Sequence, residues 1–176
     1  HPQFVGELFR MEIPEIYEGL VVIKDIVREA GDRTKLTVLS KNQMVDPVGA
    51  CVGMKGTRVQ SIVRELKGER IDIIPWSDDP RVLIAKALSP AVVESIGIND
   101  EEEKSAIVVV NDQQLALAIG KRGQNVRLAM RLTGWDIEIV SDTEYNKMRK
   151  GEIEMQLENL KNKSAEERAK KEAEGA

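Results

Sequence analysis

The chain has few of the residues on which several classes of function depend. It contains one histidine and one cysteine, and its aromatic residues are two each of Trp, Tyr and Phe. His1 and Cys51 cannot form a zinc site or a Cys–His catalytic pair, and a single Cys excludes an internal disulfide. A protein that binds nucleic acid mainly by stacking bases on rings would need more aromatics. Because His1 and Cys51 form no such site, we expect no metal and no cofactor.

Long apolar segments are also missing. No run approaches the roughly 18 apolar residues that a membrane-spanning helix needs, and no basic segment followed by an apolar stretch marks a secretory signal. We expect a protein of the reducing cytoplasm without membrane contact. The first residue is not Met, so we expect a piece of a longer protein. Its 176 residues, 41% of them hydrophobic, are sufficient for one large domain or two small ones.

The main positive feature is an internal repeat. Gly53–Gly56 and Gly120–Gly123 both have the form G-x-x-G, and each follows a short apolar stretch. Apolar residues with helical spacing come next, and each helix is expected to end at a glycine, Gly68 or Gly134, before an alternating strand. The expected inner faces of these two helices are Val59, Ile62, Val63 and Leu66 in the first, and Val126, Ala129, Met130 and Thr133 in the second.

Upstream residues extend the repeat to the order helix–strand–strand–helix–G-x-x-G–helix–strand. The expected opening helices, each with Pro near its start, are 2–9 and 80–88. The expected strands are 20–28, 35–40 and 71–74 in the first repeat, and 92–98, 106–110 and 137–140 in the second. The fold class is therefore α/β (α+β), with a three-stranded sheet packed against helices in each repeat.

Two glycines that flank a turn at the start of a helix allow phosphate to approach backbone N–H groups and the positive helix end. The loops do not fit the common nucleotide motifs. Lys55 precedes Gly56, whereas a P-loop has Lys directly after its last glycine, and neither loop has the paired glycines of a dinucleotide fingerprint. ATP, GTP and NAD are therefore disfavoured.

Charge is concentrated near the same loops, although the whole chain carries a formal net charge of −4. Between Gly120 and Arg131 there are four basic residues and no acid; between Gly53 and Arg70 there are five basic residues against two acids. A local basic surface on an acidic protein favours selective phosphate binding. The alternative is that these charges simply solvate exposed helix faces.

Together these features resemble the KH RNA-binding domain in its bacterial (type II) form, present twice. Longer strings are similar to the bacterial NusA family of transcription factors. They are Glu12–Ile16, Glu29–Thr34, Asp46–Gly53 and Ala118–Ala129.

The resemblance implies single-stranded RNA binding within a transcription complex, in support of pausing, termination and antitermination. It also implies contact with RNA polymerase through the full-length protein, and with other transcription factors. In KH domains the G-x-x-G loop clamps the backbone of about four nucleotides. The RNA-binding residues that it implies here are Gly53, Met54, Lys55, Gly56, Arg58, Gly120, Lys121, Arg122, Gly123 and Arg127.

The expected organisation is a first KH domain at 1–77, a second at 78–145 and a charged, helical or disordered tail at 146–176. A different reading, a protein-docking module whose G-x-x-G loops only shape the fold, stays open. Catalysis is rejected, because His1 at the terminus cannot complete a Ser–His–Asp set. We expect Trp76 and Trp135 to be packing residues. Because Met54 leaves one cation in the first loop against two in the second, the second loop should depend more on salt.

Overall fold

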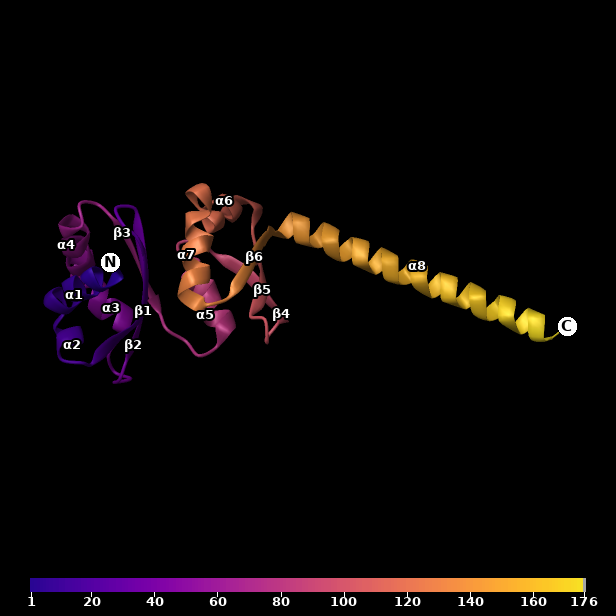
Figure 1. The fold of residues 1–176 in the computed structure, drawn as a ribbon, viewed down its shortest axis with the longest axis horizontal. Helices are drawn as coiled ribbons and strands as arrows, with labels where there is room; N and C mark the ends of the chain where they lie inside the picture. Colours follow the sequence, from indigo (N-terminus) through magenta and orange to yellow (C-terminus); the bar gives the residue numbers. More distant parts are fainter. Residues whose placement is uncertain (176) are drawn as a thin grey trace.

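The computed structural model describes residues 1–175 (Figure 1). The first repeat consists, in chain order, of α1 (Pro2–Glu12), α2 (Pro14–Tyr17), β1 (Val21–Glu29), β2 (Arg33–Ser40), α3 (Pro47–Val52), η1 (Met54–Gly56), α4 (Thr57–Glu65) and β3 (Arg70–Pro75). The predicted order is confirmed, with an opening helix that is longer than expected and an additional short helix, α2.

The second repeat has the same order. Its elements are α5 (Pro80–Ala87), β4 (Val93–Asp100), β5 (Ser105–Val110), η2 (Asp112–Gln114), α6 (Leu115–Ile119), η3 (Lys121–Gly123), α7 (Gln124–Thr133) and β6 (Asp136–Ser141). As predicted, α7 ends at a glycine, since Gly134 has the left-handed backbone conformation (φ 75°) that favours this residue at a helix end.

Each repeat forms its own three-stranded mixed sheet, β1-β2-β3 and β4-β5-β6. The first two strands of each sheet are antiparallel and joined by a hairpin turn, and the third runs parallel to the central strand. A parallel pair needs a crossover connection. The crossover is the helix–loop–helix unit that carries the G-x-x-G motif, so the sheet topology itself places this motif on one side of each sheet.

Apolar side chains from α1, α3, α4 and the first sheet form the core of the first repeat. Phe9, Leu36, Val38 and Cys51 are fully buried there, and Ile62 of α4 is 2% exposed. Burial of a large apolar side chain stabilises the fold by roughly 1.5–3 kcal/mol. These residues therefore fix α4, and with it the loop that precedes it, against the sheet.

The opposite face of the first sheet packs against helices of the second repeat. Ile74 of β3 is fully buried in the core of the second repeat, and Val27 of β1 packs against the same core. Figure 1 shows the resulting layers: helices of the first repeat, its sheet, helices α5 and α7, and the second sheet. Helix α7 thus lies between two sheets.

This position explains a prediction that was incomplete. The expected inner face of α7 omitted Leu128 and Leu132, which are among its most buried residues, together with Asn125. Because α7 contacts sheets on two sides, its buried surface is wider than the single stripe that the helical period indicates.

A buried polar cluster also joins the two repeats. In the first sheet, Lys35 Nζ lies 2.8 Å from Asp72 Oδ2, and Arg33 Nε donates to the same oxygen at 2.7 Å. Lys35 Nζ also donates to the backbone carbonyl of Ser89, which follows α5, at 2.8 Å. Burial lowers the pKa of Lys35 to about 8, although Asp72 opposes the shift. The cluster fixes the segment after α5 against the first sheet.

The two tryptophans have different environments. Trp135 is 9% exposed and belongs to the core of the second repeat, as predicted. Trp76 is 37% exposed, and the ammonium group of Lys24 lies 5.0 Å from the centre of its ring. The packing role predicted for Trp76 is therefore only partly met, because one face of its indole is covered by a cation.

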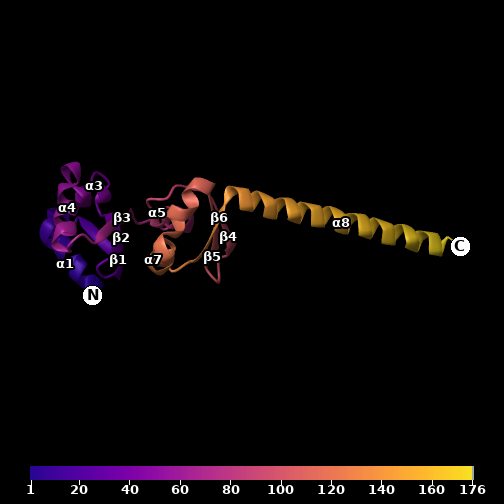
Figure 2. The same cartoon turned by 90° about the horizontal axis from the view of Figure 1, so that it is seen from above.

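The chain ends in one long helix, α8 (Asp142–Glu174), which projects away from the second sheet (Figures 1 and 2). Ser141 caps its start, because the Ser141 hydroxyl accepts a hydrogen bond from the N–H of Glu144. A helical or disordered tail was expected over 146–176, and this segment is helical to Glu174, with no buried residue in α8. Within residues 1–175, no helix is both long and apolar enough to cross a membrane.

Candidate nucleic-acid interface

The two G-x-x-G loops have the same backbone conformation. The first glycine has φ 76° and ψ 176° at Gly53, and φ 80° and ψ 170° at Gly120, a region that is open essentially only to glycine. The third position is left-handed in both, with φ 54° at Lys55 and φ 57° at Arg122. A basic residue that is held at positive φ in both copies projects its side chain from the same point of the loop.

The first glycine is required by close packing as well as by its dihedral angles. A Cβ atom at Gly120 would lie 2.7 Å from the backbone N of Asn125, so no side chain fits there. The last glycine differs, since a Cβ at Gly123 would meet its nearest neighbour, Arg127 Nη1, only at 3.9 Å. The first glycine thus lets the loop fold against its helix, while the last leaves space beside the helix start.

The helices after the loops begin without a side-chain cap. Gly56 and Gly123 occupy the N-cap positions of α4 and α7. Among helices of at least eight residues within 1–175, only α4 and α7 lack a capping side-chain acceptor. The N–H groups of Thr57 and Gln124, the first residues of the two helices, already donate to the loop carbonyls of Met54 and Lys121, so it is the helix dipole that favours an anion there. These two helix starts are therefore suited to phosphate.

Exposed cations lie beside both helix starts. Lys55 in the first loop and Lys121 and Arg122 in the second have exposed side chains, whereas Met54, 83% exposed, contributes no charge. The sequence-predicted residues of each loop are thus brought to one surface. The two arginines predicted in the following helices are placed differently.

Arg58 stabilises the first loop through hydrogen bonds to the helices that precede it. Its Nη1 donates to the backbone carbonyl of Ala50 in α3 at 2.8 Å and to Glu15 Oε2 at 2.7 Å. In the second repeat Asn125 occupies the corresponding position, and its buried Nδ2 donates to the carbonyls of Ala118 and Leu88, both at 2.9 Å. Arg58 is therefore engaged in joining α2, α3 and α4.

Arg127 connects the second loop to the first repeat. Its Nη1 donates to the carbonyl of Arg122 at 2.9 Å, and its Nε donates to Glu29 Oε1, at the end of β1, at 2.7 Å. The amide of Gln124, the first residue of α7, also donates to the Glu29 carboxylate. The Gln124 hydrogen bond is the largest cause that lowers the pKa of Glu29; its burial opposes the shift, and Arg127 adds to it.

The carboxylate of Glu69 holds the turn that presents Glu29. It accepts hydrogen bonds from the N–H of Gly31 at 2.8 Å and from the Thr34 hydroxyl at 2.6 Å, and it pairs with Arg28 at 2.9 Å. Burial alone would raise the pKa of this carboxyl, but the hydrogen bonds outweigh it and the pKa is lowered. The β1–β2 turn is therefore firmly anchored.

Between this turn and the second loop lies a cleft of about 390 Å³. It is lined by Glu29, Ala30, Asp32, Lys121, Arg122, Gln124 and Arg127. Sequence reasoning missed the contribution of Glu29, Asp32 and Gln124, because the two sides of the cleft lie more than 85 residues apart and share no local pattern.

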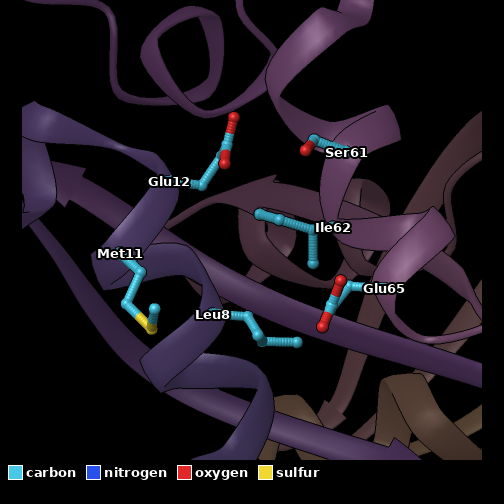
Figure 3. A pocket seen from close by; sticks show the side chains of 6 residues that line it. All are labelled: Leu8, Met11, Glu12, Ser61, Ile62 and Glu65. Atoms are coloured by element: carbon cyan, nitrogen blue, oxygen red, sulfur yellow. The ribbon is translucent and has the colours of Figure 1, made fainter.

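A second hollow, of about 220 Å³, lies between α1 and α4 (Figure 3). Its apolar side chains include Leu8 and Ile62, while Glu12 and Glu65 project from the two helices. Two carboxylates would repel a phosphate. This hollow therefore lies outside the candidate phosphate-binding surface.

Two mixed sheets, each crossed over by a helix–G-x-x-G–helix unit, define a protein with tandem KH domains. Residues 1–76 match the family described as the NusA-like first KH domain, and residues 80–147 match the NusA-like second KH domain. The chain belongs to the NusA family.

Curated relatives agree with this assignment. The transcription termination/antitermination protein NusA of Halalkalibacterium halodurans is 59% identical over 144 residues, and that of Bacillus subtilis is 58% identical over the same length. These alignments cover 82% of this chain and 37% and 38% of the relatives, so the chain spans less than two fifths of their length. NusA of Thermus thermophilus is 52% identical over 78% of this chain and 35% of its own.

A solved structure, that of APE1850, shares the fold. It superposes with a TM-score of 0.56 and 20% identity, over 79% of this chain and 97% of the other. At this identity the likeness shows the tandem arrangement of the fold alone.

Proposed function

We propose that this chain binds single-stranded RNA along its two G-x-x-G loops and, as part of a longer transcription factor, supports pausing, termination and antitermination. The observation that carries the proposal is the geometric identity of the two loops, each of which places an exposed cation beside a helix start without a side-chain cap. The names of the relatives, transcription termination/antitermination proteins, support the biological setting.

In this proposal each loop holds the RNA backbone. Phosphates approach the open side of Gly56 and Gly123 and meet the positive ends of α4 and α7. The bases lie in the groove between helix and sheet, as in other KH domains. Val59, half-buried on the first turn of α4, is suited to contact a base. Binding of this kind reads the backbone more than the sequence.

RNA polymerase and other transcription factors are the proposed partners of the full-length protein. The chain covers only 37% of the length of the Halalkalibacterium relative, so the remaining domains are candidates for the polymerase contact. The proposed task of the present domains is to hold the transcript.

Reversal of the loop charges tests RNA binding. The variant is Met54→Asp/Lys55→Asp/Lys121→Asp/Arg122→Asp, in which Asp suits the two left-handed positions because it tolerates positive φ better than most residues. Affinity is measured for short single-stranded RNA and for DNA of the same sequence, with circular dichroism to confirm the fold. We expect RNA binding to be lost.

The matched control is Lys161→Asp/Lys163→Asp/Lys171→Asp, which reverses three exposed charges on α8. Its affinity for RNA should stay within about twofold of that of wild type. Retention of affinity in the folded loop variant would overturn the proposal and favour the protein-docking reading. Equal binding of DNA would leave the loops as a phosphate site and refute selectivity for RNA.

A further inference from the structure

The cleft between the two repeats contains an anion of the protein itself. Glu29 belongs to the first repeat, yet its carboxylate contacts Gln124 and Arg127 at the start of α7 in the second. The start of a helix without a side-chain cap is where an external phosphate is expected. The carboxylate accepts from two side chains beside this helix start, Gln124 Nε2 and Arg127 Nε, which an RNA phosphate would otherwise approach.

The first loop has no equivalent contact among the hydrogen bonds of residues 1–175. Thr57 and Gln60 occupy the positions that correspond to Gln124 and Arg127, so the charged partner is absent from the helix itself. The two loops thus share a backbone geometry but differ in availability: the first is open, and the second faces a carboxylate.

We propose that the Glu29 carboxylate competes with RNA phosphate for Arg127 at the second G-x-x-G loop. RNA binds there by displacing Glu29 from the Arg127 guanidinium. This inference rests on the proposed RNA binding and adds a residue that determines affinity, delivered by the neighbouring repeat. Because the same contact joins the repeats, occupation of the second loop by RNA weakens one of the links between them.

The ion pair between Glu29 and Arg127 is weak enough for a phosphate to displace the carboxylate. The side chain of Arg127 is 45% exposed and that of Glu29 is 24% exposed, and an ion pair at such a surface is typically weak. A phosphate on the same guanidinium makes a contact of similar strength, so displacement is accessible. The turn that carries Glu29 stays in place, because Glu69 anchors it from behind.

Glu29→Gln tests the competition, because Gln has nearly the same shape and its carbonyl oxygen still accepts a hydrogen bond from Arg127. The matched control is Glu101→Gln, which removes the same charge from the exposed hairpin turn of the second repeat. RNA affinity is measured over a salt series. We expect Glu29→Gln to bind RNA about three- to tenfold more tightly, with log Kd steeper in log salt by about 0.7, the contribution of one freed phosphate partner.

A double-mutant cycle locates the effect. In an Arg127→Gln background the gain from Glu29→Gln should fall to less than about twofold, since the released cation is no longer present. If Glu29 had only a structural role, its loss would weaken binding and leave the salt slope unchanged. Affinity of Glu29→Gln equal to or below that of Glu101→Gln would overturn the competition.

Failure of this inference can be told apart from failure of the proposed function. If wild type binds RNA and loop reversal abolishes binding, but Glu29→Gln binds no more tightly than the control, only the competition is refuted. If wild type binds no RNA in the same salt series, the proposed function is refuted and the competition with it.

Discussion

Substitution of Gly120 by Ala tests the geometry of the second loop. The change forces a side chain into a backbone region that is essentially closed to residues other than glycine, at a cost of about 1–3 kcal/mol. It also places a Cβ atom 2.7 Å from the backbone N of Asn125, so the start of α7 must move. That movement disturbs two buried hydrogen bonds from Asn125, each of which contributes about 0.5–1.5 kcal/mol. The sum is a loss of about 2–6 kcal/mol.

Two other glycines provide a graded comparison. At Gly134, φ is 75° but nothing lies within 4 Å of the added Cβ, so Ala should cost only about 1–2 kcal/mol. At Gly53 the nearest atoms belong to the side chain of Arg58, which can move at the expense of its pair with Glu15. Gly53→Ala should therefore destabilise the fold by an amount between those of Gly134→Ala and Gly120→Ala.

Urea unfolding followed by fluorescence and circular dichroism measures the three variants against wild type. The expected order of destabilisation is Gly120→Ala, then Gly53→Ala, then Gly134→Ala. A loss for Gly120→Ala within about 0.5 kcal/mol of that for Gly134→Ala would refute the close approach between the loop and α7.

Three further results are expected. In RNA binding, Lys121→Ala/Arg122→Ala should reduce the slope of log Kd against log salt by about 1.4 and Lys55→Ala by about 0.7, and equal reductions would contradict the difference between the loops. Burial lowers the pKa of Lys35 from 10.5 to about 8. Between about pH 8 and 10.5, Lys35 is protonated in the unfolded chain but has lost its proton in the folded chain. The free energy of unfolding of wild type should therefore rise with pH relative to that of Lys35→Met. Free energies of the two proteins that change in parallel with pH would refute this. Glu69→Gln should lose about 2–4 kcal/mol in urea unfolding, since it weakens a buried acceptor of three donors, and a loss below 1 kcal/mol would argue against the anchored turn.

Local patterns were sufficient to predict much of the fold. Gly53 and Gly120 mark the crossover loops, and the helical spacing after them, with the alternating strands that follow, gives the repeat in the correct order. These features depend on neighbours in sequence. The same holds for the cations at Lys55 and Lys121, which the loop conformation exposes.

Contacts between the repeats could not be predicted in this way. The hydrogen bond between Glu29 and Arg127 joins residues that are 98 positions apart, and either residue alone resembles an ordinary surface charge. The buried Lys35 is a similar case: a charged residue in a strand is normally expected to face solvent, and only the carbonyl of Ser89 and the carboxylate of Asp72 explain its burial.

The role that Arg58 and Asn125 share could not be predicted from the sequence either. The glycine spacing aligns the two residues, but a charged and a neutral side chain give no sign of a common role. The structure shows why the exchange is tolerated, because both side chains donate to a carbonyl of the preceding short helix. Their common role is support of the loop from inside.

The most direct test of the account measures RNA affinity as a function of length for wild type and for two single-loop variants, Met54→Asp/Lys55→Asp and Lys121→Asp/Arg122→Asp. One KH domain holds about four nucleotides, so RNAs of about 4, 8 and 12 nucleotides separate binding to one loop from binding to both. The account predicts that wild type gains affinity at least tenfold from the shortest to the longest RNA, and that either variant abolishes this gain. Affinity independent of length in wild type, or a full gain retained in either variant, would contradict a shared RNA site.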